Sequence, residues 1–307
     1  MKEKESFNDE HVIPDVLGGV YVINTVCKDC NSNLGSKVDI KIINEFASKI
    51  FRHNQNLKGK SGKLPIIFPS ALMNQLDEKE KYRLENGDGG RITPKLIHSD
   101  LEIEALEKET YYVKMKFDDS MSTVEMQQQA DKIISKEMKK RKLGYNIINS
   151  NIVLVKSEIK LSFDVDISSN DSFISVLKMA YEFSVSNLSG YNDDPQSHVI
   201  AGILENACYE EALNYVRGHN TFEMPVCDKF NVLFSLQKDR HILLLNNFEG
   251  KLGCMVYLKD IGFYCVNLSN KPFNFNSQFD GIVLINDVKE KKYEIISISD
   301  YIVREFR

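Results

Sequence analysis

An acid followed directly by a histidine, Glu10-His11, is the pair in this 307-residue chain whose residue types could do chemistry together. An imidazole can take a proton from water, and a divalent cation beside it can stabilise negative charge on phosphate and leaving-group oxygens. Further along, the chain reads Cys27-Lys28-Asp29-Cys30-Asn31. The elements that carry these residues decide whether they can act together.

Two short strands and a turn are predicted around the acid–histidine pair. Residues 11–13 form a β-like run that Pro14 closes, and residues 20–23 are rich in β-branched and aromatic side chains, which predicts a return strand. Gly18-Gly19 allows the chain to reverse between them. Neighbours on a strand point to opposite faces, so the acid and the histidine converge on one site only if a bend or bulge intervenes.

A helix is predicted after the cysteine pair. Apolar residues recur every four positions and indicate one amphipathic helix of about five turns. The stripe consists of Leu34, Val38, Ile42, Phe46 and Ile50, widened by Ile43 and Ala47. Asn31 or Ser32 is a natural N-cap. The positive end of the helix dipole would then lie beside the acid–histidine pair, where it favours a phosphate group.

These motifs, in this order, resemble the HNH endonuclease family, in particular the subset that reads EH(V/I)IP, LGG, CxxCN, LG and D. In this chain they are Glu10–Pro14, Leu17–Gly19, Cys27–Asn31, Leu34-Gly35 and Asp39. Several short matches in the right order are much more specific than any one of them. The resemblance covers about the first fifty residues. It implies a ββα-metal finger, in which two strands and a helix surround a metal ion.

The resemblance also implies a role for each motif residue. His11 would be the general base, Glu10 a ligand of a divalent cation, and Asn31 the second ligand. Carboxylate and amide oxygens suit Mg²⁺ or Mn²⁺ better than zinc. Asp39 matches an acid often seen at the end of the motif, and it is either a further metal ligand or an acid on the solvated face of the helix.

Two positions depart from the family pattern. The middle Asn, which normally braces the loop, is Val22 here, and the nearby Asn24 is a candidate substitute. Many relatives complete a four-cysteine zinc site with a second pair before the acid–histidine pair, but no cysteine precedes Cys27 in this sequence. Cys27 and Cys30 are therefore half a structural zinc site. Either the N-terminal half is missing, or distant cysteines complete the site, or the pair is merely packed.

Composition and charge narrow the class of protein. A hydrophobic content of 42% with 27% charged residues is typical of a soluble globular protein, and the length suits about two domains. The net charge of −5 argues against a generally cationic nucleic-acid binder, so DNA contacts must come from a local patch. The sequence shows no signal peptide and no membrane span, so we expect a cytoplasmic protein. The other cysteines are interpreted as reduced core residues: Cys208, Cys227, Cys254 and Cys265.

A basic segment follows the predicted finger. From Phe46 to Leu76 there is no acid, and five residues are positively charged: Lys49, Arg52, Lys58, Lys60 and Lys63. Beside a nuclease finger these side chains are candidates for holding phosphates without reading sequence. The alternative is a solvated basic linker.

The sequence is thus predicted to be α+β, with the HNH finger in residues 1–55 and a larger domain in residues 56–307. In that domain, helices are predicted over residues 123–142, 171–188 and 197–217, and strands that form an antiparallel meander or a curved sheet from about residue 223 to 303. The acids of this domain show no recognisable ligand spacing. Target recognition, oligomerisation and regulation by a partner are the roles it could have.

The leading hypothesis is a divalent-metal-dependent endonuclease that hydrolyses DNA. Stand-alone bacterial HNH proteins often serve in defence against foreign DNA, which the resemblance makes the expected role. One alternative is a finger that has lost catalysis and acts as a nucleic-acid-binding or interaction module, and another is an enzyme that cleaves RNA. Convergence of Glu10, His11 and Asn31 on a point with room for a cation would favour catalysis. Divergence or burial would favour the module.

Overall fold

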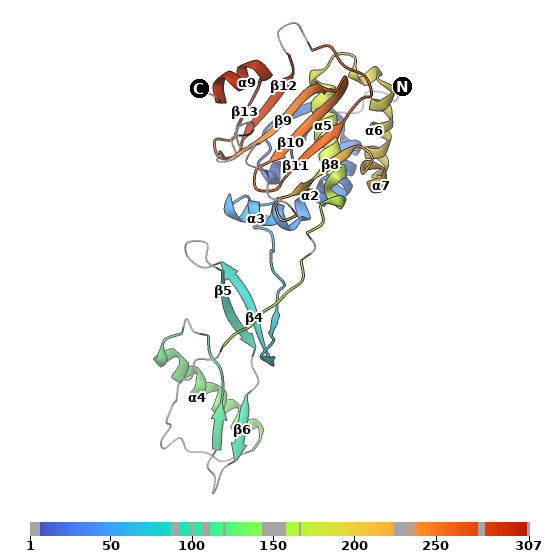
Figure 1. Cartoon of the computed structure of the whole chain (residues 1–307). Coiled ribbons are helices and arrows are strands. Elements are labelled where there is room, and N and C mark those ends of the chain that lie inside the picture. Colours follow the sequence, from blue (N-terminus) through green and yellow to red (C-terminus); the bar gives the residue numbers. More distant parts are fainter. Residues whose placement is uncertain are drawn as a thin grey trace. The chain divides into compact units, whose positions relative to one another are not determined.

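The computed structural model describes residues 7–86, 92–98, 101–105, 111–118, 121–142, 158–165, 167–223, 234, 238–275 and 280–305. The chain divides into two compact units, one formed by Met1–Ile67 with Val165–Arg307 and the other by Phe68–Asp164 (Figure 1). The predicted finger, residues 1–55, therefore shares its unit with the C-terminal part of the chain. Helices and mostly antiparallel strands confirm the α+β class.

A six-stranded antiparallel sheet lies in the first unit, with the strand order β13-β12-β9-β10-β11-β8. Its strands are β8 (Val216–Asn220), β9 (Arg240–Phe248), β10 (Lys251–Leu258), β11 (Gly262–Asn267), β12 (Ile282–Asp287) and β13 (Lys292–Ser297). Glu249-Gly250 joins β9 to β10 as a two-residue turn in which both φ angles are positive, 52° and 78°, as hairpin twist requires. β9, β10 and β11 form a meander as predicted, but β12 returns to pair with the free edge of β9.

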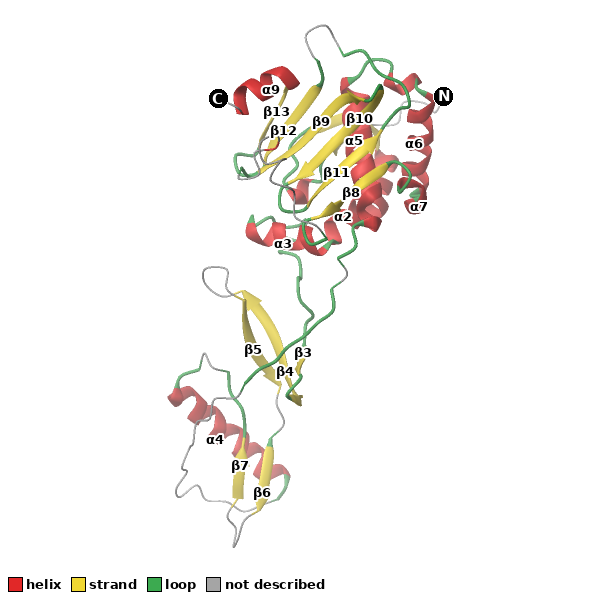
Figure 2. Ribbon diagram, viewed as in Figure 1, coloured by secondary structure: helices red, strands yellow, loops and turns green. Residues whose placement is uncertain are grey.

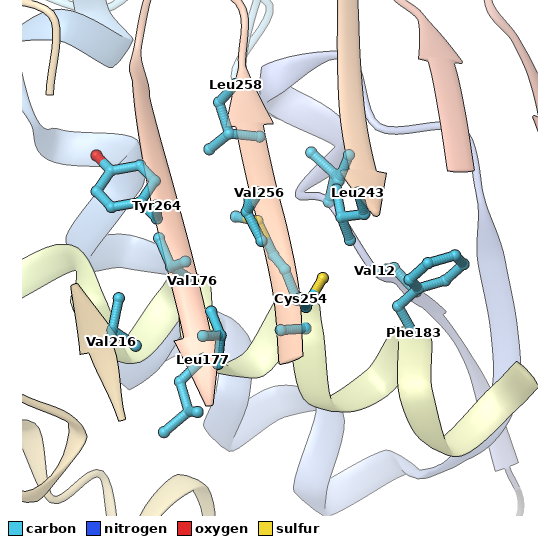
Figure 3. Close-up of a cluster of buried hydrophobic side chains, with 14 of the residues drawn as sticks. Val12, Val176, Leu177, Phe183, Val216, Leu243, Cys254, Val256, Leu258 and Tyr264 are labelled. Carbon is cyan, nitrogen blue, oxygen red and sulfur yellow. The ribbon is translucent and has the colours of Figure 1, made fainter. Parts of the chain in front are cut away.

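Helix α5 (Phe173–Asn187) lies against one face of this sheet (Figure 2). Most of its residues are buried, including Val176, Leu177 and Phe183. Val12 from the N-terminal segment lies in the same apolar core (Figure 3). A finger of about 55 residues could bury only a small apolar core by itself. The core shared with α5 and the sheet supplies the burial that it needs.

Helix α9 (Ile298–Glu305), which was not predicted, belongs to the opposite face of the sheet. It buries Tyr301 in a smaller cluster with Phe234. Successive side chains of β9 point to opposite faces of the sheet: Leu243 lies in the core with α5 and Leu244 in the cluster with α9.

The finger contains β1 (Phe7–His11), the short 3₁₀ helix η1 (Asp15–Leu17) and β2 (Val22–Cys27), which pairs antiparallel with β1. The prediction of one five-turn helix after β2 was wrong. The chain instead forms α1 (Lys28–Asn33), the π-helical segment η2 (Leu34–Asp39) and α2 (Ile40–Asn44), and after extended backbone at Glu45 it forms α3 (Phe46–Asn54). The N-cap is Cys27, whose sulfur accepts the Cys30 N–H, and not Asn31 or Ser32.

The π-helical segment has a physical cause in both sequence and packing. Apolar residues four apart drift around an α-helix of 3.6 residues per turn, whereas wider turns keep Leu34, Val38 and Ile42 all buried. The Ser175 hydroxyl of α5 donates to the Val38 carbonyl at 2.7 Å and accepts the Ile42 N–H at 3.3 Å. In a regular α-helix the Ile42 N–H would donate to the Val38 carbonyl, and the Ser175 hydroxyl lies between these two groups. After Glu45 the buried positions shift, so that Phe51 is buried in place of the predicted Ile50.

Helices elsewhere follow the predictions in part. The helix predicted over residues 123–142 corresponds to α4 (Thr123–Lys140), which opens with a capping box of Ser122 and Glu125. The predicted helix 171–188 corresponds to η4 (Asn170–Ser172) and α5. The single helix over 197–217 was wrong. After η5 (Tyr191–Asp193) the chain forms α6 (Pro195–Asn206) and α7 (Tyr209–Ala212), separated by Ala207 in the left-handed conformation, and then strand β8.

The second unit contains a three-stranded sheet, a hairpin and helix α4. The sheet consists of β3 (Leu72–Asn74), β4 (Asp77–Asn86) and β5 (Ile92–His98), and the hairpin of β6 (Glu102–Ala105) and β7 (Tyr111–Lys114). Tyr82, Ala130 and Met138 are buried here. In the described ranges of the chain, no helix combines the length and the apolar character that crossing a membrane would require.

Candidate active site in the finger

The β1–β2 hairpin places Glu10 and His11 on opposite sides. Glu10 pairs with Ile23 and His11 with Val22, and the pairing is irregular between Asn8 and Glu10. A bulge is thus present, as convergence would require, but it precedes the acid instead of separating it from the histidine. The two neighbours keep the alternation of a regular strand, so their side chains diverge.

The His11 imidazole is half-buried and is held by the glycine turn. Its Nδ1 lies 3.1 Å from the Gly19 carbonyl oxygen. A carbonyl oxygen can only accept, so Nδ1 carries the hydrogen, and Nε2 of the neutral ring keeps its lone pair. Nε2 makes no hydrogen bond with any residue that the structure describes. The ring therefore has a fixed tautomer and a nitrogen able to accept a proton.

The two glycines of the turn are required by close approach. Gly18 has φ +86°, and a Cβ added there would lie 2.7 Å from a methyl carbon of Val288. A Cβ added at Gly19 would lie 1.8 Å from the Ile13 carbonyl oxygen. A larger residue at Gly19 must move the turn, and one at Gly18 must move Val288 or the turn and also adopt a positive φ.

Strand β12 holds this turn through Asn286, which is completely buried. Its side-chain oxygen accepts the Val20 N–H at 2.7 Å, and its side-chain nitrogen donates to the Gly18 carbonyl at 2.8 Å. The Asn286 side chain thus pairs with the backbone of the turn as a neighbouring strand would. The same turn contains Gly19, whose carbonyl contacts His11.

His241 of β9 holds the preceding residue of the same loop. Its Nε2 lies 2.8 Å from the Leu17 carbonyl oxygen, and its Nδ1 accepts the Lys259 N–H at 3.0 Å. Burial, only partly offset by the Leu17 carbonyl, lowers the pKa of His241 to about 4. The neutral ring satisfies both neighbours, whereas a protonated ring would turn an N–H toward the Lys259 N–H.

We expect His241 to make the protein less stable in mild acid. Its folded pKa lies below the unfolded value of about 6.5, so between these values the unfolded chain binds the extra proton and stability falls as pH falls. The free energy of unfolding should decrease by about 2 kcal/mol from pH 7 to pH 5 through this group. Urea unfolding of wild type and His241→Gln at both pH values checks this. An equal pH dependence in the two proteins would contradict the prediction.

Glu10 and Asp39 meet at a lysine of helix α5. The Lys178 ammonium forms a short ion pair with the Glu10 carboxylate and lies 3.1 Å from Asp39 Oδ2. It also donates to the carbonyl oxygen of His11 at 3.0 Å and lies 3.5 Å from Glu182 Oε2, one turn along the helix. Lys178 is completely buried, and Glu10 and Asp39 are only 4% and 7% exposed. The solvated position considered for Asp39 is therefore wrong.

Charge in this buried cluster is unbalanced, with three carboxyl groups around one ammonium. Burial raises the pKa of Glu10, Asp39 and Glu182, although Lys178 lowers each of them. Burial disfavours the Lys178 ammonium, but the three acids prevail and raise its pKa. Asp39 Oδ1 and both Glu182 carboxyl oxygens are buried and have no hydrogen-bond partner among the residues that the structure describes. Lys178 thus stays charged, and the acids share its one positive charge.

Asn31 and Asn24 both bind the residue at the bulge. The Asn31 side-chain nitrogen donates to the Asp9 carbonyl at 2.8 Å. With its amide oriented so that the nitrogen faces Asp9, Asn24 donates to Asp9 Oδ1 at 2.8 Å. Asn24 therefore braces the strand beside Glu10, which is the kind of role considered for the missing middle Asn.

The predicted ligands do not fit a divalent cation in this arrangement. Glu10 and Asp39 offer hard oxygens, but both carboxylates converge on the Lys178 ammonium. The Asn31 side-chain nitrogen donates to the Asp9 carbonyl, so of the three predicted ligands only the Asn31 oxygen is left without a bonded partner among the described residues. A divalent ion at the carboxylates would have to share them with an existing cation. Among the described residues, no group of three or more His, Cys, Asp or Glu side chains could hold a metal.

Cys27 and Cys30 lie together at the start of α1, with their sulfurs 2.6 Å apart and no disulfide between them. Two ligands are half of a structural zinc site, and the part of the chain that the structure describes supplies no third. Of the cysteines expected in the core, Cys254 is buried and Cys208 half-buried, but Cys265 is exposed. Cys227 lies outside the described residues.

The basic residues are not all accessible. Lys58, Lys60 and Lys63 are exposed around a turn in which the Gly59 N–H donates to the Lys63 carbonyl. Lys49 is half-buried on α3. Arg52, also on α3, is only 6% exposed, and burial lowers its pKa. It therefore belongs to the packing of the finger and is not placed to contact DNA.

Three described residues that hold the segment from Glu10 to Val20 were missed by sequence reasoning: Lys178, His241 and Asn286. Lys178 could have been noticed, because Lys178 and Glu182 are charged residues one turn apart within an otherwise uncharged helix. The other two lie in strands and show no comparable signal.

Comparison with known proteins supports the resemblance. Residues 1–47 match a protein-family model described as HNH endonuclease. Neither the curated proteins nor the solved structures contain a match to this chain. An HNH segment indicates a nuclease or nucleic-acid-related function, and HNH nucleases generally use divalent metals.

Proposed function

We propose that the N-terminal finger hydrolyses phosphodiester bonds of DNA, with His11 as the general base. One observation carries the proposal. In a segment that matches HNH endonucleases, the His11 ring is held by Gly19 through Nδ1, which leaves the Nε2 lone pair for a water molecule.

In this mechanism Nε2 of His11 takes a proton from water as the water oxygen bonds to phosphorus. The bond from phosphorus to the leaving 3′ oxygen breaks, and that oxygen takes a proton from solvent water. The accessible lysines after the finger, Lys58, Lys60 and Lys63, hold the phosphate backbone. The family resemblance implies Mg²⁺ or Mn²⁺, which would stabilise charge on the phosphate and leaving oxygens. Since the predicted ligands do not fit such an ion in this structure, the mechanism assigns it no step.

The test is conversion of supercoiled plasmid to nicked or linear DNA by full-length wild type and by His11→Ala, purified in the same way. Cleavage by wild type that the variant lacks supports the proposal. Equal cleavage by both indicates a contaminant and removes His11 as the base. Parallel reactions with Mg²⁺, Mn²⁺ or EDTA test the dependence on metal, and a labelled RNA substrate tests the choice of nucleic acid.

We expect the three exposed lysines to supply much of the affinity for DNA. Replacing Lys58, Lys60 and Lys63 together with Gln should weaken binding and reduce the slope of log affinity against log salt by up to about 3, roughly one per phosphate contact. The matched control replaces three exposed lysines near the β12–β13 turn: Lys289, Lys291 and Lys292. Fluorescence anisotropy with labelled duplex measures both. Equal loss in the two triple variants would contradict a local phosphate contact.

The second candidate is a finger that binds nucleic acid without cleaving it. A specific observation favours it: Glu10 is buried against Lys178, so Glu10, His11 and Asn31 do not converge on a common point. This reading predicts duplex binding with no cleavage under any metal condition. A role in defence, a regulatory partner and an oligomeric state remain predictions, to be tested once the activity is known.

A further inference from the structure

Lys178 lies where the finger and the rest of the chain meet. It is in the middle of helix α5, outside the segment that matches the family, and is completely buried. An ammonium in such a place is retained only if it is paired. Its partners are Glu10 from β1 and Asp39 from the end of η2, 168 and 139 residues away in the chain.

The same ammonium also binds the backbone of the proposed base. Lys178 Nζ donates to the His11 carbonyl oxygen at 3.0 Å, while the His11 ring is held at Nδ1 by Gly19. His11 is thus fixed from both sides of its strand. The carbonyl contact, the Glu10 pair and the Asp39 pair all depend on one side chain.

We propose that Lys178 is the resident cation of this finger: its ammonium, and not a divalent ion, neutralises Glu10 and Asp39, and it positions His11. The positioning of His11 rests on the function proposed above. The replacement of the ion at the two carboxylates does not, because it follows from the ion pairs alone. A divalent ion would need several oxygen ligands in place of the ammonium.

The first test measures Mn²⁺ binding by electron paramagnetic resonance, using full-length protein. Glu10→Gln and Asp39→Asn should bind as much Mn²⁺ as wild type does. Lys178→Ala should gain a site, because it leaves Glu10, Asp39 and Glu182 without a cation and with space for one. The gain should vanish in Lys178→Ala with Glu10→Gln. A wild-type Mn²⁺ site that Glu10→Gln abolishes would overturn the proposal.

The second test measures thermal stability. Lys178→Ala should lower the melting temperature by roughly 10 °C, since it leaves buried carboxylates unpaired. Saturating Mn²⁺ should restore roughly 5 °C or more in this variant and nothing in wild type. Lys41→Ala, which breaks the exposed ion pair with Asp171, should change the melting temperature little. If Lys178→Ala does not fold without metal, the Glu10→Gln comparison of Mn²⁺ binding still decides the question.

The third test concerns positioning. In Lys178→Ala, kcat for plasmid cleavage should fall about 100-fold with KM changed little, because the base is displaced while the DNA-binding lysines are intact. A variant that folds and keeps wild-type kcat would show that Lys178 does not position His11. If wild type cleaves no nucleic acid, the proposed function fails, while the Mn²⁺ and stability results still decide whether Lys178 is the resident cation.

Discussion

His11→Asn should cleave supercoiled plasmid at least about 100-fold more slowly than wild type, because the variant has no group able to take a proton from water. Asparagine is the informative replacement. Its side-chain nitrogen can occupy the position of Nδ1 and donate to the Gly19 carbonyl, so the turn keeps the contact that His11 makes at 3.1 Å. Stability close to wild type together with lost cleavage would assign the effect to chemistry and not to folding.

His53→Gln is the matched control for this experiment, because a glutamine side-chain nitrogen can reach the position of Nε2, the atom through which His53 contacts its carbonyl. His53 is also half-buried, lies in α3, and approaches a backbone carbonyl, that of Pro65, at 2.6 Å. It has no place in the proposed mechanism, so its variant should retain cleavage within a few-fold of wild type. Quantitative single-turnover rates on the same plasmid compare the two. Similar rates for wild type and His11→Asn would remove His11 as the base, and similar losses in both variants would indicate a general effect on folding.

Gly19→Ala should destabilise the protein by about 3 kcal/mol or more and should also impair cleavage. A Cβ at this position would lie 1.8 Å from the Ile13 carbonyl oxygen, so the turn must move. That movement would strain the Asn286 hydrogen bonds to Val20 and Gly18 and displace the carbonyl that orients His11. The loss of stability and the loss of cleavage would then both result from displacement of the turn.

Gly35→Ala is the control, since Gly35 is also a motif glycine without a positive φ, and an added Cβ would have no atom of the described residues within 4 Å. That variant should unfold at the same denaturant concentration as wild type or slightly higher, because alanine restricts the unfolded chain. Urea unfolding followed by circular dichroism measures both variants. A Gly19→Ala protein as stable as Gly35→Ala would mean that the turn tolerates the added carbon, and the close approach would not explain the glycine.

The family resemblance and much of the fold could be predicted from the sequence. The motif order from Glu10 to Asp39 predicted the HNH segment, which the match over residues 1–47 confirms. The strand patterns predicted most of the C-terminal sheet, because β-like apolar runs separated by Asn, Gly and Lys-Asp turns are visible in the sequence. The interruption of the finger helix was missed, since it depends partly on the Ser175 hydroxyl from a remote helix.

What the sequence by itself determined is local: the reversal at Gly18-Gly19, the placement of His11 beside it, and the positions of most strands. These properties depend on the conformations available to each residue and on its immediate neighbours. The partners of Glu10 and Asp39 were decided only by the tertiary structure. Desolvation and ion pairing depend on which distant side chains arrive at a site, and here helix α5 brings Lys178 to both acids. The same residues that suggested a metal site in the sequence are therefore, in the fold, the two carboxylates around a buried ammonium.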